Sequence, residues 1–432
     1  MLQNLIEKHK NIVNGRYKVL QNYFEGKQNI LHREIKNDKP NNKNVFNYCR
    51  YVTDQLTGYF LGKPVSYSCN DEELLKEVLL NYKINNEEVE NNNLAHKASV
   101  KGTSYELCYM NEESEFKFKA LDTDSVFLIL DSSIDNNIKY AIRYYDVEDP
   151  LNNEKTTCVV VYTNEKVINY ISKESGLEYK DEENHIFGEV PVVEFPNNRY
   201  RTGDFEFIVD IQDAINKLKN DIANDLDYYS NCLLALEGVE DTDTATISGV
   251  EKGENRTLFL PEGSKAYFIT KQINNSVVES YGVQLKEDLH LLASIPDLTK
   301  LNISGDMKAT AIKSLFFGTE QVVAEKERQF KMGLEKRLRL FFKFLDVKRN
   351  KKADWRDIEI TFNRNIPVNL AEFGDSVIKL QGTLPTEMVL EELKKAGLDI
   401  DVNRALELLK SEKEVYTFDN SIPLMEGDIS EE

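Results

Sequence analysis

The chain has 432 residues and a formal net charge of −20, and 41% of its residues are hydrophobic and 10% aromatic. This hydrophobic content is typical of a folded protein and excludes a disordered chain, and the length allows two or three compact domains. The acidic excess argues against a protein that holds nucleic acid tightly, because phosphate binding needs clustered Lys and Arg.

The five cysteines stand far apart, with neither a CxxC pair nor a nearby histidine that would complete a zinc site. They are Cys49, Cys69, Cys108, Cys158 and Cys232. We therefore expect reduced thiols, no metal and no cofactor. The sequence has no signal peptide and no apolar run near the roughly 20 residues of a membrane span, so we expect a protein made and used in the cytoplasm.

The first 200 residues divide into a helical part and a β part. Residues 1–35 have helical spacing of apolar side chains, and the polar run NDKPNNKN at 37–44 precedes a helix from about Val45 to Gly62. From about 98 to 200, short runs rich in Val, Ile, Tyr and Phe with turn-like separators predict an antiparallel β region.

Helical spacing returns at 205–236 and at 276–293, where apolar stripes run beside faces rich in aspartate. Each stripe can pack within the subunit, against an identical neighbour, or both. Between them, residues 238–275 contain RTLFLPEGSKAYFIT, which predicts a hairpin with its turn at Pro261–Ser264.

The last third of the chain begins with a loop at 294–307, bracketed by Pro296 and Gly305. The longest helical pattern follows at 308–347 and would reach roughly 60 Å. A short strand in DIEITFNRNIP, two amphipathic segments separated by Gly397, and an acidic tail that we expect to be disordered complete the chain.

No catalytic motif stands out. The segment GYFLGKPV at 58–65 differs from a phosphate-binding loop, because Pro64 stands where a magnesium-binding hydroxyl is required. Two carboxylate pairs lack the histidine or glycine-rich loop that a metal or acid–base site would need. These pairs are Asp122 with Asp124 and Glu325 with Glu327. We predict that the protein is not an enzyme.

Several blocks, in this order and spacing, resemble a known family across nearly the whole chain. They are YFEGKQNI at 23–30, NNKNVFNYCRYVTDQLTGYFLGKPVSY at 41–67, FGEVPVVEFPNN at 187–198, SIPDLTKLNISGDMKATAIKSLF from 294, EKERQFKMGLEKRLRLFF from 325 and IPVNLAEFGDSVIKL from 366. The chain resembles the portal proteins of long-tailed siphophages that infect low-GC Gram-positive bacteria. Ala309 departs from the family pattern, which usually has Gly or Ser there.

The resemblance implies an α+β portal-protein fold with named parts. We expect a wing at 1–204, stem helices at 205–237 and 276–293, a clip at 238–275, a tunnel loop at 294–307, a long helix returning to the wing at 308–370, a crown at 371–415 and a tail at 416–432.

The resemblance also implies the function. Such proteins form a ring of about twelve subunits at one capsid vertex of the virion, and double-stranded DNA passes through the ring during packaging and ejection. The implied partners are terminase, a head–tail adaptor, and the major capsid and scaffolding proteins, with no membrane. The alternatives are a cytosolic oligomeric scaffold or binding module without a DNA conduit and, more distantly, a nucleotide-handling enzyme.

Three sets of residues follow as candidate sites. The tunnel loop would present Asp297, Leu298, Thr299, Lys300, Leu301 and Asn302 to DNA. The stem would turn Asp213, Asn220, Asp221 and Asp225 toward the channel, or these side chains would face solvent. The clip would contact partners through Leu258, Leu260, Tyr267 and Phe268. Because only Lys300 is basic between Pro296 and Gly305, the loop could touch a duplex without binding it.

Overall fold

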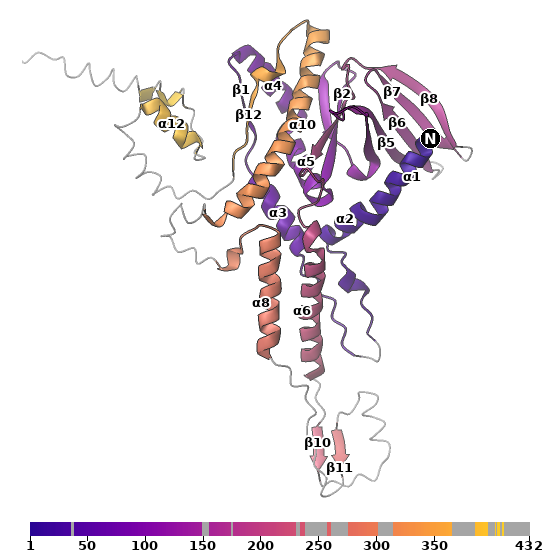
Figure 1. The fold of residues 1–432 in the computed structure, drawn as a ribbon, viewed down its shortest axis with the longest axis vertical. Coiled ribbons are helices and arrows are strands. Elements are labelled where there is room, and N and C mark those ends of the chain that lie inside the picture. The colour runs from indigo at the N-terminus through magenta and orange to yellow at the C-terminus, as the bar shows by residue number, and fades with distance from the viewer. Residues whose placement is uncertain are drawn as a thin grey trace, which may run out of the picture.

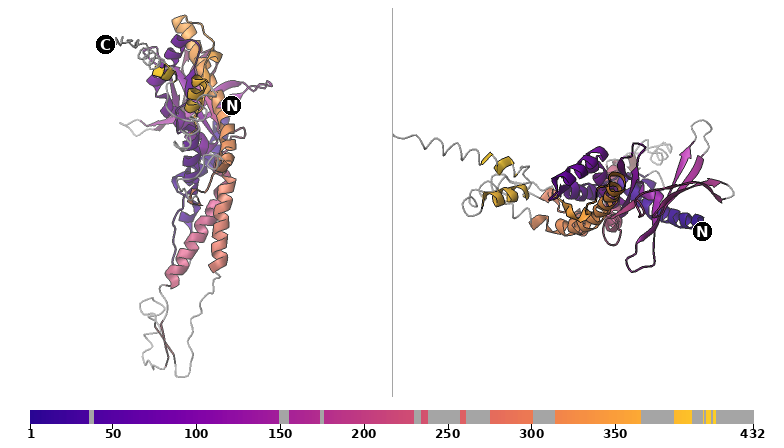
Figure 2. Two further views of the ribbon diagram at one scale, coloured as in Figure 1. Left: turned by 90° about the vertical axis from the view of Figure 1, so that its left-hand side faces the viewer. Right: turned by 90° about the horizontal axis from the view of Figure 1, so that it is seen from above.

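The computed structural model combines an upper body of helices and sheets with a two-helix stalk that projects from it (Figure 1). The residues that it describes are 1–35, 39–148, 155–173, 176–229, 234–237, 257–260, 275–300, 314–364, 385–395, 402, 404–406 and 408–409. Turning the molecule by 90° shows that the body and the stalk share one narrow, elongated profile (Figure 2). The expected mixture of helix and sheet, the α+β class, is confirmed.

The largest sheet is an antiparallel meander with the strand order β4-β5-β6-β7-β8. Its strands are β4 (Val126–Leu130), β5 (Ile138–Glu148), β6 (Lys155–Tyr162), β7 (Lys166–Lys173) and β8 (Gly176–Asn184). A three-stranded sheet of order β3-β2-β9 lies next to it. Its strands are β3 (Phe116–Ala120), β2 (Thr103–Met110) and β9 (Val192–Pro196). The antiparallel β region predicted from the sequence is confirmed, although its first strand begins at Thr103.

The N-terminal helix α1 (Leu2–Ile12) lies on one face of the five-stranded sheet (Figure 1). Its buried His9 bonds through Nδ1 with the Tyr144 hydroxyl at 2.9 Å, and its ring stacks on Phe127. Burial lowers the pKa of His9 to about 4, so the imidazole is neutral at neutral pH. The chain continues through a π-helical turn at Val13–Tyr17 into α2 (Lys18–Glu25).

Three further helices complete the N-terminal half of the body. They are α3 (Tyr48–Leu61), α4 (Glu72–Asn85) and α5 (Glu87–Lys101). The sequence analysis predicted α3 but neither α4 nor α5. α5 buries polar side chains, among them Glu90 and Asn91, so its core-facing side does not appear as an apolar stripe. Short strands β1 (Ser66–Ser68) and β12 (Glu359–Thr361) pair antiparallel nearby.

The long helix α10 (Phe317–Arg349) is the centre of the core. The predicted start at 308 lies outside the described residues. Its neighbour β9 comes so close that a Cβ at Gly333 would lie 2.4 Å from the Phe195 ring. A shorter helix, α12 (Thr386–Lys395), lies toward the C-terminus, and the predicted tail at 416–432 is outside the described part.

A buried ion pair joins α10 to the three-stranded sheet. Arg337 donates two hydrogen bonds of 2.8 Å to Glu106, and both side chains are fully buried. Arg337 also donates to Asn91 of α5 and lies 4.2 Å from the centre of the Phe118 ring. Burial raises the pKa of Glu106, and the guanidinium opposes that effect. Removing either partner would leave a buried charge without compensation.

In the described part of the chain, no helix is both long enough and apolar enough to cross a membrane.

The core position of α10 gives a stability test. Leu334 is fully buried, so Leu334→Ala should lower the free energy of unfolding by about 2–5 kcal/mol, through lost burial and the cavity left behind. Met332, two residues away on the opposite, exposed side of the same helix, is the matched control, and Met332→Ala should change stability by less than about 0.5 kcal/mol. Denaturant unfolding measures both, and equal midpoints for the two variants would contradict this packing.

Candidate functional site: the stalk and its junction with the body

The stalk consists of α6 (Val209–Tyr229) and α8 (Asn275–Leu292). The helix predicted at 276–293 is confirmed, but the one predicted at 205–236 ends at Tyr229. Residues Leu234–Glu237 form strand β10, which pairs in parallel with β11 (Thr257–Leu260). The prediction was wrong here because the apolar run LLAL at 233–236 fits both helical and extended spacing.

The clip residues fall in or near this strand pair. Leu258 and Leu260 lie in β11, which confirms the strand expected in RTLFL. Its described partner is β10, while the predicted turn at Pro261–Ser264 and the residues Tyr267 and Phe268 lie outside the described residues. Their contacts with partners stay a prediction.

The two stalk helices pack through their apolar stripes near the body. Ile215 of α6 and Leu285 and Leu289 of α8 are buried. Leu218 comes within 3.4 Å of the position that a Cβ would take at Gly282, so the helices touch closely there. Farther from the body, Ile222 and Leu226 are exposed. The upper stripes therefore pack within the subunit.

The opposite side of α6 binds residues 27–35 and 39–48, which together we call the clasp. It passes along α6 away from the body and returns beside it (Figure 1). The returning arm meets four amide side chains of α6, spaced four residues apart on one face of the helix. They are Gln212, Asn216, Asn220 and Asn224.

Each of these amides hydrogen-bonds to the clasp backbone, and together they form what we call the amide ladder. Gln212 accepts from the Tyr48 N–H at 2.9 Å and donates to the Phe46 carbonyl at 2.7 Å. Asn220 accepts from the Asn44 N–H at 2.7 Å and donates to its carbonyl at 2.8 Å. The remaining bonds join Asn216 to the Phe46 N–H and Asn224 to the Asn42 N–H.

The amide ladder works because two repeats match in length. Four helical residues rise about 6.0 Å, and two extended residues span about 6.6 Å. An amide at every fourth helical position therefore meets the backbone of every second clasp residue. The N–H and C=O groups of this extended segment are satisfied without a β-sheet.

Two of the three aspartates that were predicted to face the channel bond to the other arm of the clasp, and one of them also bonds to Tyr23 of α2. Asp213 accepts from the Tyr23 hydroxyl at 2.7 Å and from Asn29 at 2.8 Å. Asp221 forms an ion pair with Arg33.

Asn220 is fully buried in the ladder, so it does not face the channel as the sequence analysis predicted. Asp225 is half-buried, and its orientation toward a channel stays a prediction.

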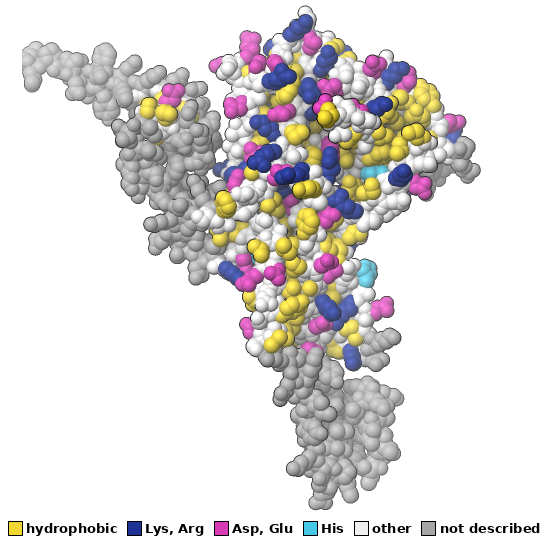
Figure 3. Space-filling view, in the orientation of Figure 1, with side chains coloured by type: hydrophobic (Ala, Val, Ile, Leu, Met, Phe, Trp, Pro, Cys, Tyr) yellow, Lys and Arg dark blue, Asp and Glu magenta, His cyan; other side chains and the backbone are white. Residues whose placement is uncertain are grey.

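The clasp and α8 lie on opposite sides of α6. Residues two apart on a helix differ by about 200° around its axis, so Leu218 and Ile222 point away from Asn220. The stalk is thus layered in the order clasp, α6, α8. In the space-filling view, apolar side chains reach the surface along the stalk (Figure 3).

The outer side of α8 carries an apolar stripe, which we call the α8 stripe. It consists of Val277, Tyr281, Leu291 and Leu292, with Asp288 among them. Their exposed fractions run from 49% for Tyr281 to 75% for Leu291, which is unusual for a helix of a monomer.

The first residues of the predicted tunnel loop are fixed to α8. Asp297 accepts a hydrogen bond of 2.6 Å from the Thr299 hydroxyl and lies 2.9 Å from the Lys286 ammonium. Burial alone would raise the pKa of Asp297, but the bonds from Thr299 and Lys286 outweigh it and lower the pKa to about 2. Leu298–Lys300 form a 3-10 turn, and Lys300 pairs with Glu287 at 2.5 Å. Leu301 and Asn302 lie outside the described residues.

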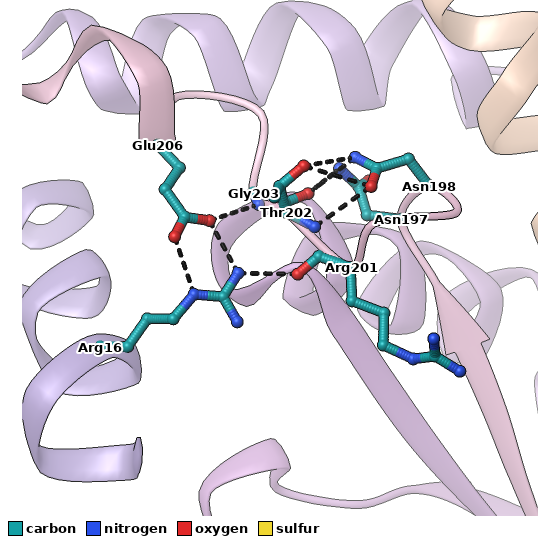
Figure 4. Close-up of polar contacts among 7 residues, drawn as sticks. All are labelled: Arg16, Asn197, Asn198, Arg201, Thr202, Gly203 and Glu206. Carbon is teal, nitrogen blue, oxygen red and sulfur yellow. Dashed lines mark hydrogen bonds and ion pairs between the residues drawn. The ribbon is translucent and has the colours of Figure 1, made fainter.

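A close-packed loop joins β9 to α6 (Figure 4). Arg16 reaches it from the π-helical turn, donates bonds of 2.7 and 2.8 Å to Glu206, and donates to the Arg201 carbonyl at 2.7 Å. Asn197 and Asn198 each donate to the Thr202 carbonyl at 2.9 Å. The loop is therefore held by its own asparagines at one end and by Arg16, from another part of the body, at the other.

Backbone contact and a buried ion pair fix the same loop from behind. A Cβ at Gly102 would lie 2.1 Å from the Arg201 carbonyl oxygen, and at Gly102 φ is 87°, so only glycine fits. Asp204 pairs with Lys326 of α10, and both side chains are almost fully buried. The start of α6 is thus rigidly joined to the body.

The other carboxylates considered from the sequence are ion-paired. Lys101 lies 2.8 Å from Asp124 and 3.7 Å from Asp122. Glu325 pairs with Arg199 and Arg328, and Glu327 with Arg364. Among the residues that the structure describes, no three His, Cys, Asp or Glu side chains gather as metal ligands would.

Sequence reasoning missed the amide ladder and the contacts of Arg16, Asp204 and Lys326. The ladder has a visible signal, namely four Gln or Asn residues at steps of four in one helical pattern. The other contacts join positions more than 100 residues apart and have no comparable signal.

The ladder predicts a local effect. Asn220→Ala should leave both the N–H and the C=O of Asn44 without partners, at a cost of about 1–3 kcal/mol, and should speed amide exchange in residues 42–48. Lys217→Ala, an exposed position of the same helix, is the control. Hydrogen-exchange mass spectrometry measures the effect. Unchanged exchange in the clasp would show that the ladder does not hold it.

Comparisons with known proteins show what the chain is similar to. A family model described as "Phage portal protein, SPP1 Gp6-like" matches residues 2–416. A portal protein of Clostridium phage phiCD119 is 24% identical over 442 residues, which cover 93% of this chain and 93% of that protein. A portal protein of Bacillus phage SPP1 is 22% identical, with 88% of this chain and 79% of that protein covered.

Proposed function

Because the chain belongs to the SPP1 Gp6-like family of phage portal proteins, we propose that its subunits close into a ring whose stalks surround the DNA channel. The portal function, with its role in DNA packaging, follows from the family. The layered stalk supports this assignment to the ring, and we propose that α6 and α8 are the stem and the upper body is the wing.

The observation that most directly supports a ring is the α8 stripe. Four large apolar side chains, Val277, Tyr281, Leu291 and Leu292, are about half exposed or more in one subunit. Leaving them in water would forgo the burial that drives most protein association. Contact with neighbouring subunits would cover them, and identical neighbours related by rotation close into a ring.

An acidic protein suits a DNA conduit. Each phosphate neutralised by Lys or Arg adds salt-sensitive affinity and would slow the passage of a duplex. The net charge of −20 limits such contacts. Asp210 and Glu279 are exposed on the stalk and are available to a channel wall, whereas Asp213, Asp221 and Asp227 are already engaged by the clasp.

We assign the remaining parts by the family. Residues 294–307 would form the tunnel loop and 371–415 the crown. The clip at 238–275 would meet terminase and then the head–tail adaptor. The ring, of about twelve subunits, would be assembled in the host cytoplasm and would sit at one vertex of the virion, in contact with capsid and scaffolding proteins.

Purified protein should form closed rings with a central hole. The physical reason is the unburied α8 stripe on each subunit, which a ring would cover. Electron-microscopy class averages give the subunit count, and mass photometry gives the mass. A uniform monomer at micromolar concentration in both low and high salt would contradict the proposal.

The tunnel loop gives a paired test, because Glu287 neutralises Lys300 at 2.5 Å. If Lys300 touches passing DNA, Glu287→Gln should leave the Lys300 charge unpaired and lower the packaging rate. Lys300→Ala should leave the packaging rate equal or raise it. Both variants should form normal rings. An in vitro packaging assay measures the rates, and identical rates in both variants and the unaltered protein would show that Lys300 does not meet DNA.

A further inference from the structure

The stalk presents two chemically different flanks. Helix α8, which carries the α8 stripe, lies on one side, and the clasp lies on the other, with α6 between them (Figure 1). A subunit with different surfaces on opposite flanks cannot bury both in a symmetric pair. It can bury both by head-to-tail contact around a ring.

The α8 flank forms one line along the helix. Val277, Tyr281, Asp288 and Leu292 follow each other at steps of four, seven and four residues, which keeps them on one side. If this side lined a water-filled channel, its apolar groups would stay wet. Asp288, within the line, is exposed and forms no ion pair with the residues that the structure describes.

The clasp flank carries two exposed lysines and one exposed acid, Glu34, and its returning arm is fixed in place. Lys39 and Lys43 are exposed, and in the part of the chain that the structure describes neither forms an ion pair. Leu31 adds an exposed apolar side chain on the same segment. The amide ladder holds the returning arm, so docking on it would cost little ordering entropy.

We infer that the α8 stripe of one subunit docks on the clasp of the next subunit, with Asp288 close to Lys43 or Lys39. This inference rests on the proposed ring and names the two surfaces that meet in its stalk region. The occupant of the clasp is a second copy of this chain, because the apolar stripe and acidic group of one flank complement Leu31 and the two lysines of the other.

Cysteine cross-linking tests the contact. Lys43→Cys and Asp288→Cys are made singly and together, and rings are treated with a short thiol-reactive cross-linker. The double variant should give a ladder of covalent oligomers on a denaturing gel, and a mixture of the two single variants should give mainly dimers. Each single variant alone, and the unaltered protein with its native cysteines, should stay monomeric.

Charge reversal provides a second readout that does not depend on cysteine chemistry. Lys43→Glu should lower ring yield at a fixed protein concentration by about tenfold, since like charges would then face each other. Adding Asp288→Lys in the same chain should restore the yield. Lys352→Glu, an exposed reversal far from the stalk, should leave the yield unchanged.

The outcomes separate the two claims. Cross-linking of Asp288→Cys with itself would mean that stripe meets stripe, and would overturn the head-to-tail contact. Rings without a mixed cross-link, and without any effect of Lys43→Glu, would overturn the inference and leave the portal function intact. If the unaltered protein formed no rings at all, the proposed function itself would fail, and this contact with it.

Discussion

The stalk depends on one match of lengths, that between four residues of helix and two residues of extended chain. Because of it, four amides of α6 hold the clasp mainly through its backbone, and the side chains of Gln28 and Asn42 add one bond each. The four are Gln212, Asn216, Asn220 and Asn224. A backbone-directed contact tolerates changes of sequence in the clasp but not changes of spacing in α6. The same match fixes α6 in rotation, so that its apolar side faces α8.

The junction extends this constraint into the body. Arg16 ties the first helical segment to Glu206, and the buried pair of Asp204 with Lys326 ties the same loop to α10. α10 is in turn held to the sheet by Arg337 and Glu106. These ion pairs form a continuous route from the core to the start of α6, so the stalk leaves the body at a fixed angle.

The sequence predicted those parts whose stabilising residues are close together in the chain. The helix at 276–293, the antiparallel strands and the buried side of the long helix, including Leu334 and Leu338, all follow from local spacing of apolar residues. It failed where polar groups do the packing. α5 buries Glu90 and Asn91, and nothing local shows that Asn29 and Arg33 come back to meet Asp213 and Asp221 of α6.

The two sides of α6 differ in how they resist sliding. Hydrogen bonds to the clasp are directional, so moving α6 along it by one or two ångströms would break the whole register at once, and the next register lies a full repeat of about 6 Å away. The contact of Leu218 with α8 is apolar and non-directional, and it changes gradually with displacement. Sliding along the stalk axis is therefore easier between α6 and α8 than between α6 and the clasp. A force along the stalk is transmitted to the body through α6.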